Sequence, residues 1–302
     1  MKGRPQARML PDGRRLHLQH GPIDLVIGAE RRDGSVAIEA LLAARHRFES
    51  VLEELVGELP LLRSTCAPDS PRPRGSVAKR MDAAVRPYAA RRFITPMAAV
   101  AGSVADEILQ AMLAAGPIWR AYVNNGGDIA LHLKSGASFS VAIASVENHK
   151  LGVVALNAGD GVGGIATSGN KGRSLSFGIA DAVTVLAGSS ADADAAATLI
   201  ANAVDLPGHP SIERSKACDL QPDSDLGERL VATRCGQLSL REIEMALASG
   251  AAVADEFIVQ GQIVGAALFL RGVAMLKGTA KLGRIRIGPP APGIEDARTA
   301  SP

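Results

Sequence analysis

Aromatic side chains are scarce in this chain of 302 residues, of which Phe, Trp and Tyr together make up 3%. Proteins that recognise RNA through stacking platforms need several exposed rings, so the composition argues against that class. The scarcity also limits how a planar ligand ring could be held between side chains. The aromatic residues that could contact such a ring are Phe93, Trp119, Tyr122, Phe139 and Phe177.

Cysteine is equally sparse, with three residues that form no CxxC pair and have no histidine at metal-ligand spacing. This count fits a reducing compartment and argues against a disulfide scaffold or a structural zinc site. The formal net charge is only +2. A chain with so little net charge has no strong field that would attract nucleic acid or a membrane surface.

The sequence also shows no apolar run that we expect to span a membrane. The most apolar tract, residues 261–276, is interrupted by Gln262 and Arg271, whereas a helix that spans a bilayer needs about 20 apolar residues. Residues 1–18 contain no apolar segment of the roughly 7–15 residues found in a secretory signal. We therefore expect a cytoplasmic protein with neither a membrane nor a nucleic-acid partner.

Apolar residues make up 47% of the chain and charged residues 21%, which is ordinary globular usage. Hydrophobic periodicity and turn residues predict an α+β fold, in which antiparallel sheets pack against helices. The expected helices cover residues 35–59, 76–85, 97–115, 190–204 and 238–248. The expected strands cover residues 23–27, 121–123, 129–133, 139–143, 153–156, 182–186 and 229–233, and a closing hairpin pairs 257–259 with 263–270.

Three regions follow from the same patterns. Residues 1–20 are basic and are expected to be irregular. Residues 21–288 are expected to form a single domain, with its core motifs between residues 96 and 204. Residues 289–302 are rich in proline and polar side chains, which predicts a disordered tail.

The first segment with possible chemistry is Asn124-Asn125-Gly126-Gly127-Asp128, between two expected strands. Asn-Gly is a strong signal for a tight hairpin turn, which needs no ligand. Paired glycines also allow a ligand to approach the backbone closely and contact its N–H groups. Both interpretations stay open from the pattern alone.

The second segment runs from Gly161 to Ser174 and concentrates glycines, small hydroxyl residues and two cations, Lys171 and Arg173. Such a segment can surround an anion with N–H groups and positive side chains. It is neither a Walker A loop nor a dinucleotide fingerprint, because the spacing GxxxxGK[ST] and the following helix are both missing. A long flexible loop without a ligand is the alternative.

The third segment lies in the helix expected after Ser189. Asp194 and Thr198 are four residues apart, so they share one helix face and present a carboxylate beside a hydroxyl. Oxygen ligands of this kind suit a hard cation such as Mg²⁺ that bridges phosphates. The alternative is an acidic first turn that complements the helix dipole, together with a threonine that faces the core.

Taken in order, these segments resemble the ApbE family of FAD:protein FMN transferases. Ala101-Gly102-Ser103-Val104-Ala105-Asp106 is similar to the family's KGYAVD helix, and Asn125-Gly126-Gly127-Asp128 to its NAGGD turn. Thr167-Ser168-Gly169 matches its TSG motif. Val183-Thr184-Val185 with Asp194-Ala195-Ala196-Ala197-Thr198 resembles its SVTV strand and DALAT metal helix.

The resemblance implies an ApbE-like (T-fold-like) fold and a role for each motif. Asp194 and Thr198 would bind Mg²⁺. The residues that would contact the pyrophosphate of FAD are Asn125, Gly126, Gly127, Asp128, Thr167, Ser168, Gly169 and Arg173. The implied partners are a flavin nucleotide or another phosphate-bearing small molecule, and a target protein.

A closer resemblance points to a distinct uncharacterised protein family allied to ApbE. It rests on the segment from Gly172 to Val185, on His20-Gly21-Pro22-Ile23-Asp24-Leu25 and on the Pro222–Gly227 segment, and it covers about residues 15–280. The chain departs from ApbE itself at two places. Ala101 stands where the ApbE motif has lysine, and no HIIDP segment follows Gly169.

These departures leave two hypotheses. The first is an enzyme, either an Mg²⁺-dependent flavin transferase or an FAD pyrophosphatase. The second is a catalytically degenerate ApbE-like module that binds a flavin or another anionic cofactor, or that acts as an assembly partner.

Overall fold

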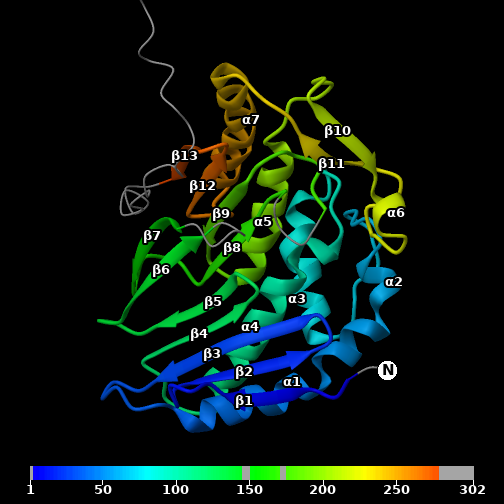
Figure 1. Ribbon diagram of the computed structural model, residues 1–302. Coiled ribbons are helices and arrows are strands. Elements are labelled where there is room, and N and C mark those ends of the chain that lie inside the picture. The colour runs from blue at the N-terminus through cyan, green and yellow to red at the C-terminus, as the bar shows by residue number, and fades with distance from the viewer. Residues whose placement is uncertain (1–2, 145–149, 171–174, 279–302) are drawn as a thin grey trace, which may run out of the picture.

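The computed structural model describes residues 3–144, 150–170 and 175–278, and its largest feature is one antiparallel sheet (Figure 1). Across the sheet, each strand pairs antiparallel with the next. From one edge to the other, the strands are β1 (Gln6–Met9), β2 (Arg15–His20), β3 (Ile23–Glu30), β4 (Arg120–Asn125), β5 (Asp128–Leu133), β8 (Gly164–Ser168), β9 (Ala182–Ala187), β12 (Gly265–Leu270) and β13 (Val273–Gly278).

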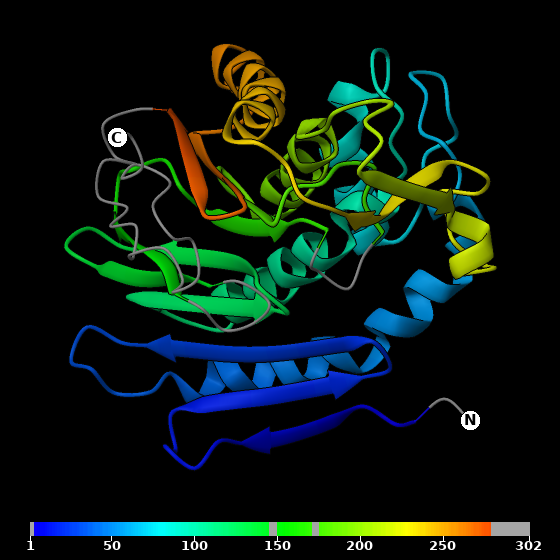
Figure 2. The ribbon, with the colours of Figure 1, turned by 45° about the horizontal axis from the view of Figure 1, so that its top comes forward.

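Helices and two separate pairs of antiparallel strands accompany this sheet, which confirms the α+β class. The helical elements are α1 (Ile38–Gly57), α2 (Leu59–Leu62), α3 (Ser76–Val85), η1 (Arg86–Tyr88), η2 (Pro96–Ala99), α4 (Val100–Ala114), α5 (Ser190–Ala203), α6 (Ala217–Leu220) and α7 (Leu240–Val259). The hairpins pair β6 (Ser138–Ala144) with β7 (Lys150–Asn157), and β10 (Ile212–Lys216) with β11 (Leu230–Cys235). Figure 2 shows helices α1, α4, α5 and α7 along the sheet.

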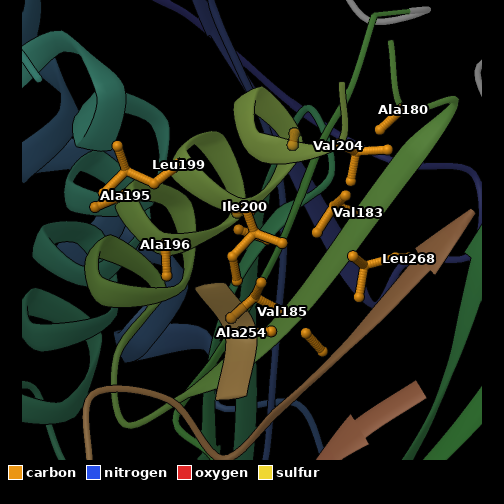
Figure 3. Close-up of a cluster of buried hydrophobic side chains, with 14 of the residues drawn as sticks. Ala180, Val183, Val185, Ala195, Ala196, Leu199, Ile200, Val204, Ala254 and Leu268 are labelled. Atoms are coloured by element: carbon orange, nitrogen blue, oxygen red, sulfur yellow. The ribbon is translucent and has the colours of Figure 1, made fainter. Parts of the chain in front are cut away.

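The core beside α5 forms where this helix packs on β9, β12 and α7 (Figure 3). Val183 and Val185 of β9 meet Ile200 of α5, and Leu268 of β12 belongs to the same cluster. Alanine occupies most of the buried positions of α5, so the helix approaches the strands closely. Successive strand residues point to opposite faces, and Leu186 accordingly lies in a different cluster, under the β6–β7 hairpin.

A second cluster lies between α1, α4 and strands β2–β4. Its members include Phe48 of α1, Leu18 and Leu25 of the first strands, and Ile108 of α4, all almost fully buried. The Pro96–Ala114 segment is long and apolar enough to cross a membrane by length and composition, with a mean hydropathy of 1.3, but 56% of its window is buried within the fold. Helix α4 packs against α1, α3, α5 and β4, so it serves as a core helix of this fold.

Two expectations about secondary structure are wrong. Residues 6–20 are not irregular but form the β1–β2 hairpin, in which Leu16 and Leu18 are buried and their neighbours point outward. Residues 257–259 are not a strand: α7 continues to Val259, because the buried Phe257 completes its apolar face. The closing hairpin is formed by β12 and β13 instead. The segment expected as a tail, 289–302, lies outside the described residues.

Candidate functional site

A cavity of about 1300 Å³ lies where the β4–β5 turn and the ends of β8 and β9 meet α4 and α5. It brings together almost all the residues singled out from the sequence, although they come from three separate segments. Those that line it are Asn125, Gly126, Gly127, Asp128, Thr167, Ser168, Gly169, Asp194 and Thr198. Arg173 lies outside the described residues.

The floor of the cavity depends on a close crossing of α4 and α5. A Cβ added to Gly102 of α4 would lie 2.2 Å from the carbonyl oxygen of Ser190, so only glycine fits there. Four residues further along α4, the Asp106 carboxylate accepts hydrogen bonds from the backbone N–H groups of Ser190 (3.1 Å) and Ala191 (2.9 Å). These bonds satisfy N–H groups that the first turn of a helix leaves unpaired, and they fix the start of α5 against α4.

Burial raises the pKa of the Asp106 carboxyl to about 6, against the downward effect of its two N–H donors. The same close packing buries Asp194, which lies one turn beyond Ser190 on α5. Burial raises the pKa of the Asp194 carboxyl well above its ordinary value, and the neighbouring Asp128 carboxylate raises it further. The backbone N–H of Gly102 donates to Asp194 Oδ2 at 3.0 Å and acts in the opposite direction.

A divalent cation fits this environment. It would relieve the repulsion between the Asp194 and Asp128 carboxylates, and the Thr198 hydroxyl lies on the same face of α5 and also lines the cavity. Within the described residues no group of three or more His, Cys, Asp or Glu side chains could hold a metal ion. Mg²⁺ is usually bound through one or two carboxylates together with substrate phosphates, so an incomplete protein shell suits it.

The β4–β5 turn forms one wall of the site and is a two-residue hairpin loop. Asn125 and Asp128 are paired across it, and Gly126 and Gly127 have φ values of +64° and +115° that favour glycine. The N–H of Gly127 donates to Asn124 Oδ1 at 2.9 Å, so this donor already has a partner. The sequence pattern correctly predicted a tight turn, and the turn also faces the cavity.

Side chains on both sides of this turn connect it to the other walls. Asn125 Nδ2 donates to the carbonyl oxygen of Ala101 at 3.0 Å, and the N–H of Thr167 donates to Asp128 Oδ1 at 3.2 Å. The hydroxyls of Thr167 and Thr184 are hydrogen-bonded at 2.8 Å. Thr167 belongs to strand β8 and not to a flexible loop, so this part of the glycine-rich segment is held in the sheet.

Several residues of the cavity were not singled out from the sequence. The hydroxyl of the buried Thr95 donates a hydrogen bond to Asp225 Oδ2. Asn202 also lines the cavity and lies two turns beyond Asp194 on α5. The Pro222–Gly227 segment, which contains Asp225, could be noted from the sequence only for its family resemblance, and its contact with Thr95 was not foreseen because the two residues lie 130 positions apart. The spacing of Asn202 from Asp194 was a usable signal, since i and i+8 share one face of a helix.

Comparison with known proteins places the chain in a family. The family model described as AbpE bacteria matches residues 7–282, so the chain belongs to this family. A UPF0280 protein of Methanothrix thermoacetophila is 34% identical over 188 residues, which cover 61% of this chain and 75% of the relative. A UPF0280 protein of Methanosphaerula palustris is 37% identical over 184 residues, which cover 60% and 73%.

Two solved structures are similar to the chain over most of its length. The flavin transferase ApbE from Vibrio cholerae has 13% sequence identity and a TM-score of 0.46, and covers 92% of this chain and 99% of its own. The apo form of the flavinyl transferase ApbE from Pseudomonas stutzeri has 12% identity and a TM-score of 0.44, with coverages of 93% and 96%.

Proposed function

We propose that the cavity binds a flavin nucleotide such as FAD together with Mg²⁺, and that the protein acts on the pyrophosphate of this ligand. One observation carries the proposal: the β4–β5 turn, β8, α4 and α5, which are distant in sequence, meet around a single cavity that is lined by the neighbouring Asp128 and Asp194 side chains. A cation between these two side chains would favour their ionised form and would offset the repulsion between carboxylates and an anionic pyrophosphate.

In this proposal Asp194 and Thr198 hold the cation, which would neutralise charge on a phosphoryl oxygen when bound. Asp194 is positioned for this by the N–H of Gly102. The glycine turn leaves room at Gly127 for the pyrophosphate to approach the backbone, since a Cβ on Gly127 would meet no atom within 4 Å. Asn125 keeps the turn fixed through its bond to Ala101.

The alternative is a non-catalytic module that binds the same ligand. Ala101 lines the cavity at the position of the lysine in the ApbE motif, and its side chain supplies no ammonium group. This departure favours binding without turnover. In either case a target protein is a candidate partner. We also propose a cytoplasmic location, because Cys66, Cys218 and Cys235 are all free, as expected in a reducing compartment.

Calorimetric titration of the purified protein with FAD, with and without Mg²⁺, tests the proposal. We expect binding that requires Mg²⁺ and that weakens by tenfold or more in Asp194→Asn, since the carboxylate charge is lost without a change of shape. Asp192→Asn is the matched control, because Asp192 lies on the same helix and does not line the cavity. Equal FAD affinities for the two variants would contradict the cation site.

Chromatography of the same mixtures separates the enzyme from the binding module. Release of FMN and AMP, or a flavin attached to a protein substrate, identifies catalysis. Mg²⁺-dependent FAD binding without either product identifies the binding module. If FAD does not bind at any Mg²⁺ concentration, both forms of the proposal are wrong.

A further inference from the structure

Two of the chain's few aromatic rings line the proposed nucleotide cavity. Phe93 and Phe177 lie with ring centroids 6.0 Å apart and planes inclined by 52°. Of the other rings considered from the sequence, Tyr122 and Phe139 line a separate cavity of about 190 Å³. The structure therefore selects Phe93 and Phe177 as the pair that can contact a planar ligand in the large cavity.

Contacts with the surrounding structure hold the backbone at Phe177 and the ring of Phe93. The N–H of Phe177 donates to Asn202 Oδ1 at 2.9 Å, and its carbonyl oxygen accepts from Arg214 Nη1 at 2.6 Å. The guanidinium carbon of Arg229 lies 3.5 Å from the centroid of the Phe93 ring, a cation–π contact. Rings that are placed before a ligand arrives lose little conformational entropy when it binds.

Helix α5 connects this aromatic pair to the proposed cation site at Asp194 and Thr198. Asp194, Thr198 and Asn202 are spaced by four residues and all line the cavity, so they mark one face of the helix. Eight residues of α-helix extend about 12 Å along the axis. The cation site and the contact to Phe177 therefore lie two turns apart along one wall, which leaves room for a sugar or ribityl chain between a phosphate and a ring.

We infer that Phe93 and Phe177 form a ring-binding subsite, which takes the planar ring of a nucleotide whose phosphates lie at Asp194 and Thr198. The inference rests on the proposed function and adds the orientation of the ligand. The ring is the isoalloxazine or the adenine of FAD, which share the same stacking chemistry. Stacking on an aromatic side chain changes affinity by about tenfold or more per ring.

The test measures affinities of wild type, Phe93→Leu and Phe177→Leu for FAD and for inorganic pyrophosphate, all in Mg²⁺. We expect each leucine variant to bind FAD about tenfold more weakly and pyrophosphate as tightly as wild type. Phe177→Tyr keeps a ring and is expected to retain FAD affinity. Phe139→Leu is the control, because it makes the same change in the other cavity. Titrations with FMN and with ADP identify which ring occupies the subsite.

A ligand-side measurement needs no variant and remains valid if a leucine substitution impairs folding. Wild-type protein should bind FMN at least tenfold more tightly than ribitol 5-phosphate, or ADP at least tenfold more tightly than pyrophosphate. The subsite is refuted if wild type binds FAD with Mg²⁺ but neither ring adds affinity, or if folded leucine variants bind FAD like wild type. Failure of wild type to bind FAD and pyrophosphate refutes the proposed function itself.

Discussion

At the scale of single residues, the site depends on a glycine as much as on its carboxylates. Gly102 allows α4 and α5 to cross closely, and its N–H is also a donor to Asp194. A larger residue would therefore disturb the helix contact and the proposed cation ligand together. The sequence predicted neither role, because residues 101–106 could be noted only for their resemblance to a family motif.

We predict that Gly102→Ala lowers the free energy of unfolding by about 1–3 kcal/mol or more, because the added methyl group would overlap the carbonyl group of Ser190. Urea unfolding measures this loss. Gly57→Ala is the control, since its Cβ would enter open space at the end of α1 and its φ is not positive. Indistinguishable unfolding midpoints for the two variants would contradict the close crossing.

At the scale of secondary-structure elements, α7 shows how a helix can be fixed at its start. Ser239 and Glu242 form a capping box, and Glu242 Oε1 also lies 2.9 Å from His209 Nε2. The hydrogen bond with His209 is the largest cause that lowers the pKa of Glu242 to about 2, and the bonds from Ser239 add to it. A carboxyl with a lowered pKa stabilises the fold above its unfolded-state pKa.

This linkage predicts a pH effect. The contribution of Glu242 is fully present above pH 4.5 and is lost as the pH falls toward about 2. Glu242→Gln should therefore lose less stability than wild type across this interval, which urea midpoints at several pH values would show. Glu244→Gln, an exposed change on the same helix, should keep the wild-type slope. A parallel decline for wild type and Glu242→Gln would contradict the assigned role.

The same helix shows where sequence patterns reach their limit. Most helices and strands were predicted to within a few residues, because their apolar periodicity agrees with their burial. The end of α7 was not, since Phe257, Ile258 and Val259 have strand propensity that tertiary packing overrides. Strand β8 was missed because Gly164 and its neighbours favour a loop locally and become a strand only by pairing with β5 and β9.

For the site, the sequence predicted the residue types better than their arrangement. Asp194 and Thr198 could be paired by helical spacing, and the glycine turn by its composition. The contacts of Asp194 with Gly102, and of Thr95 with Asp225, join residues 92 and 130 positions apart. No local pattern contains such distances, so these contacts needed the fold.

At the scale of the whole molecule, the cavity lies between the two main clusters of buried residues. Val104, from the cluster between α1, α4 and strands β2–β4, lines one part of the cavity. Leu199, from the cluster beside α5, lines another part. Segments far apart in sequence, such as the β4–β5 turn and residues 224–226, both line this space. A ligand there would contact both clusters at once and would resist their separation.

We therefore predict that FAD with Mg²⁺ slows amide hydrogen exchange in segments from both clusters, including residues 100–104 and 198–202. Strand β13 does not line the cavity and should exchange at the ligand-free rate, which makes it the internal control. Exchange measured by mass spectrometry in wild type and in Asp194→Asn gives the comparison, since the variant should show little protection. Protection confined to one cluster would mean that the ligand occupies only part of the cavity and does not bridge the two.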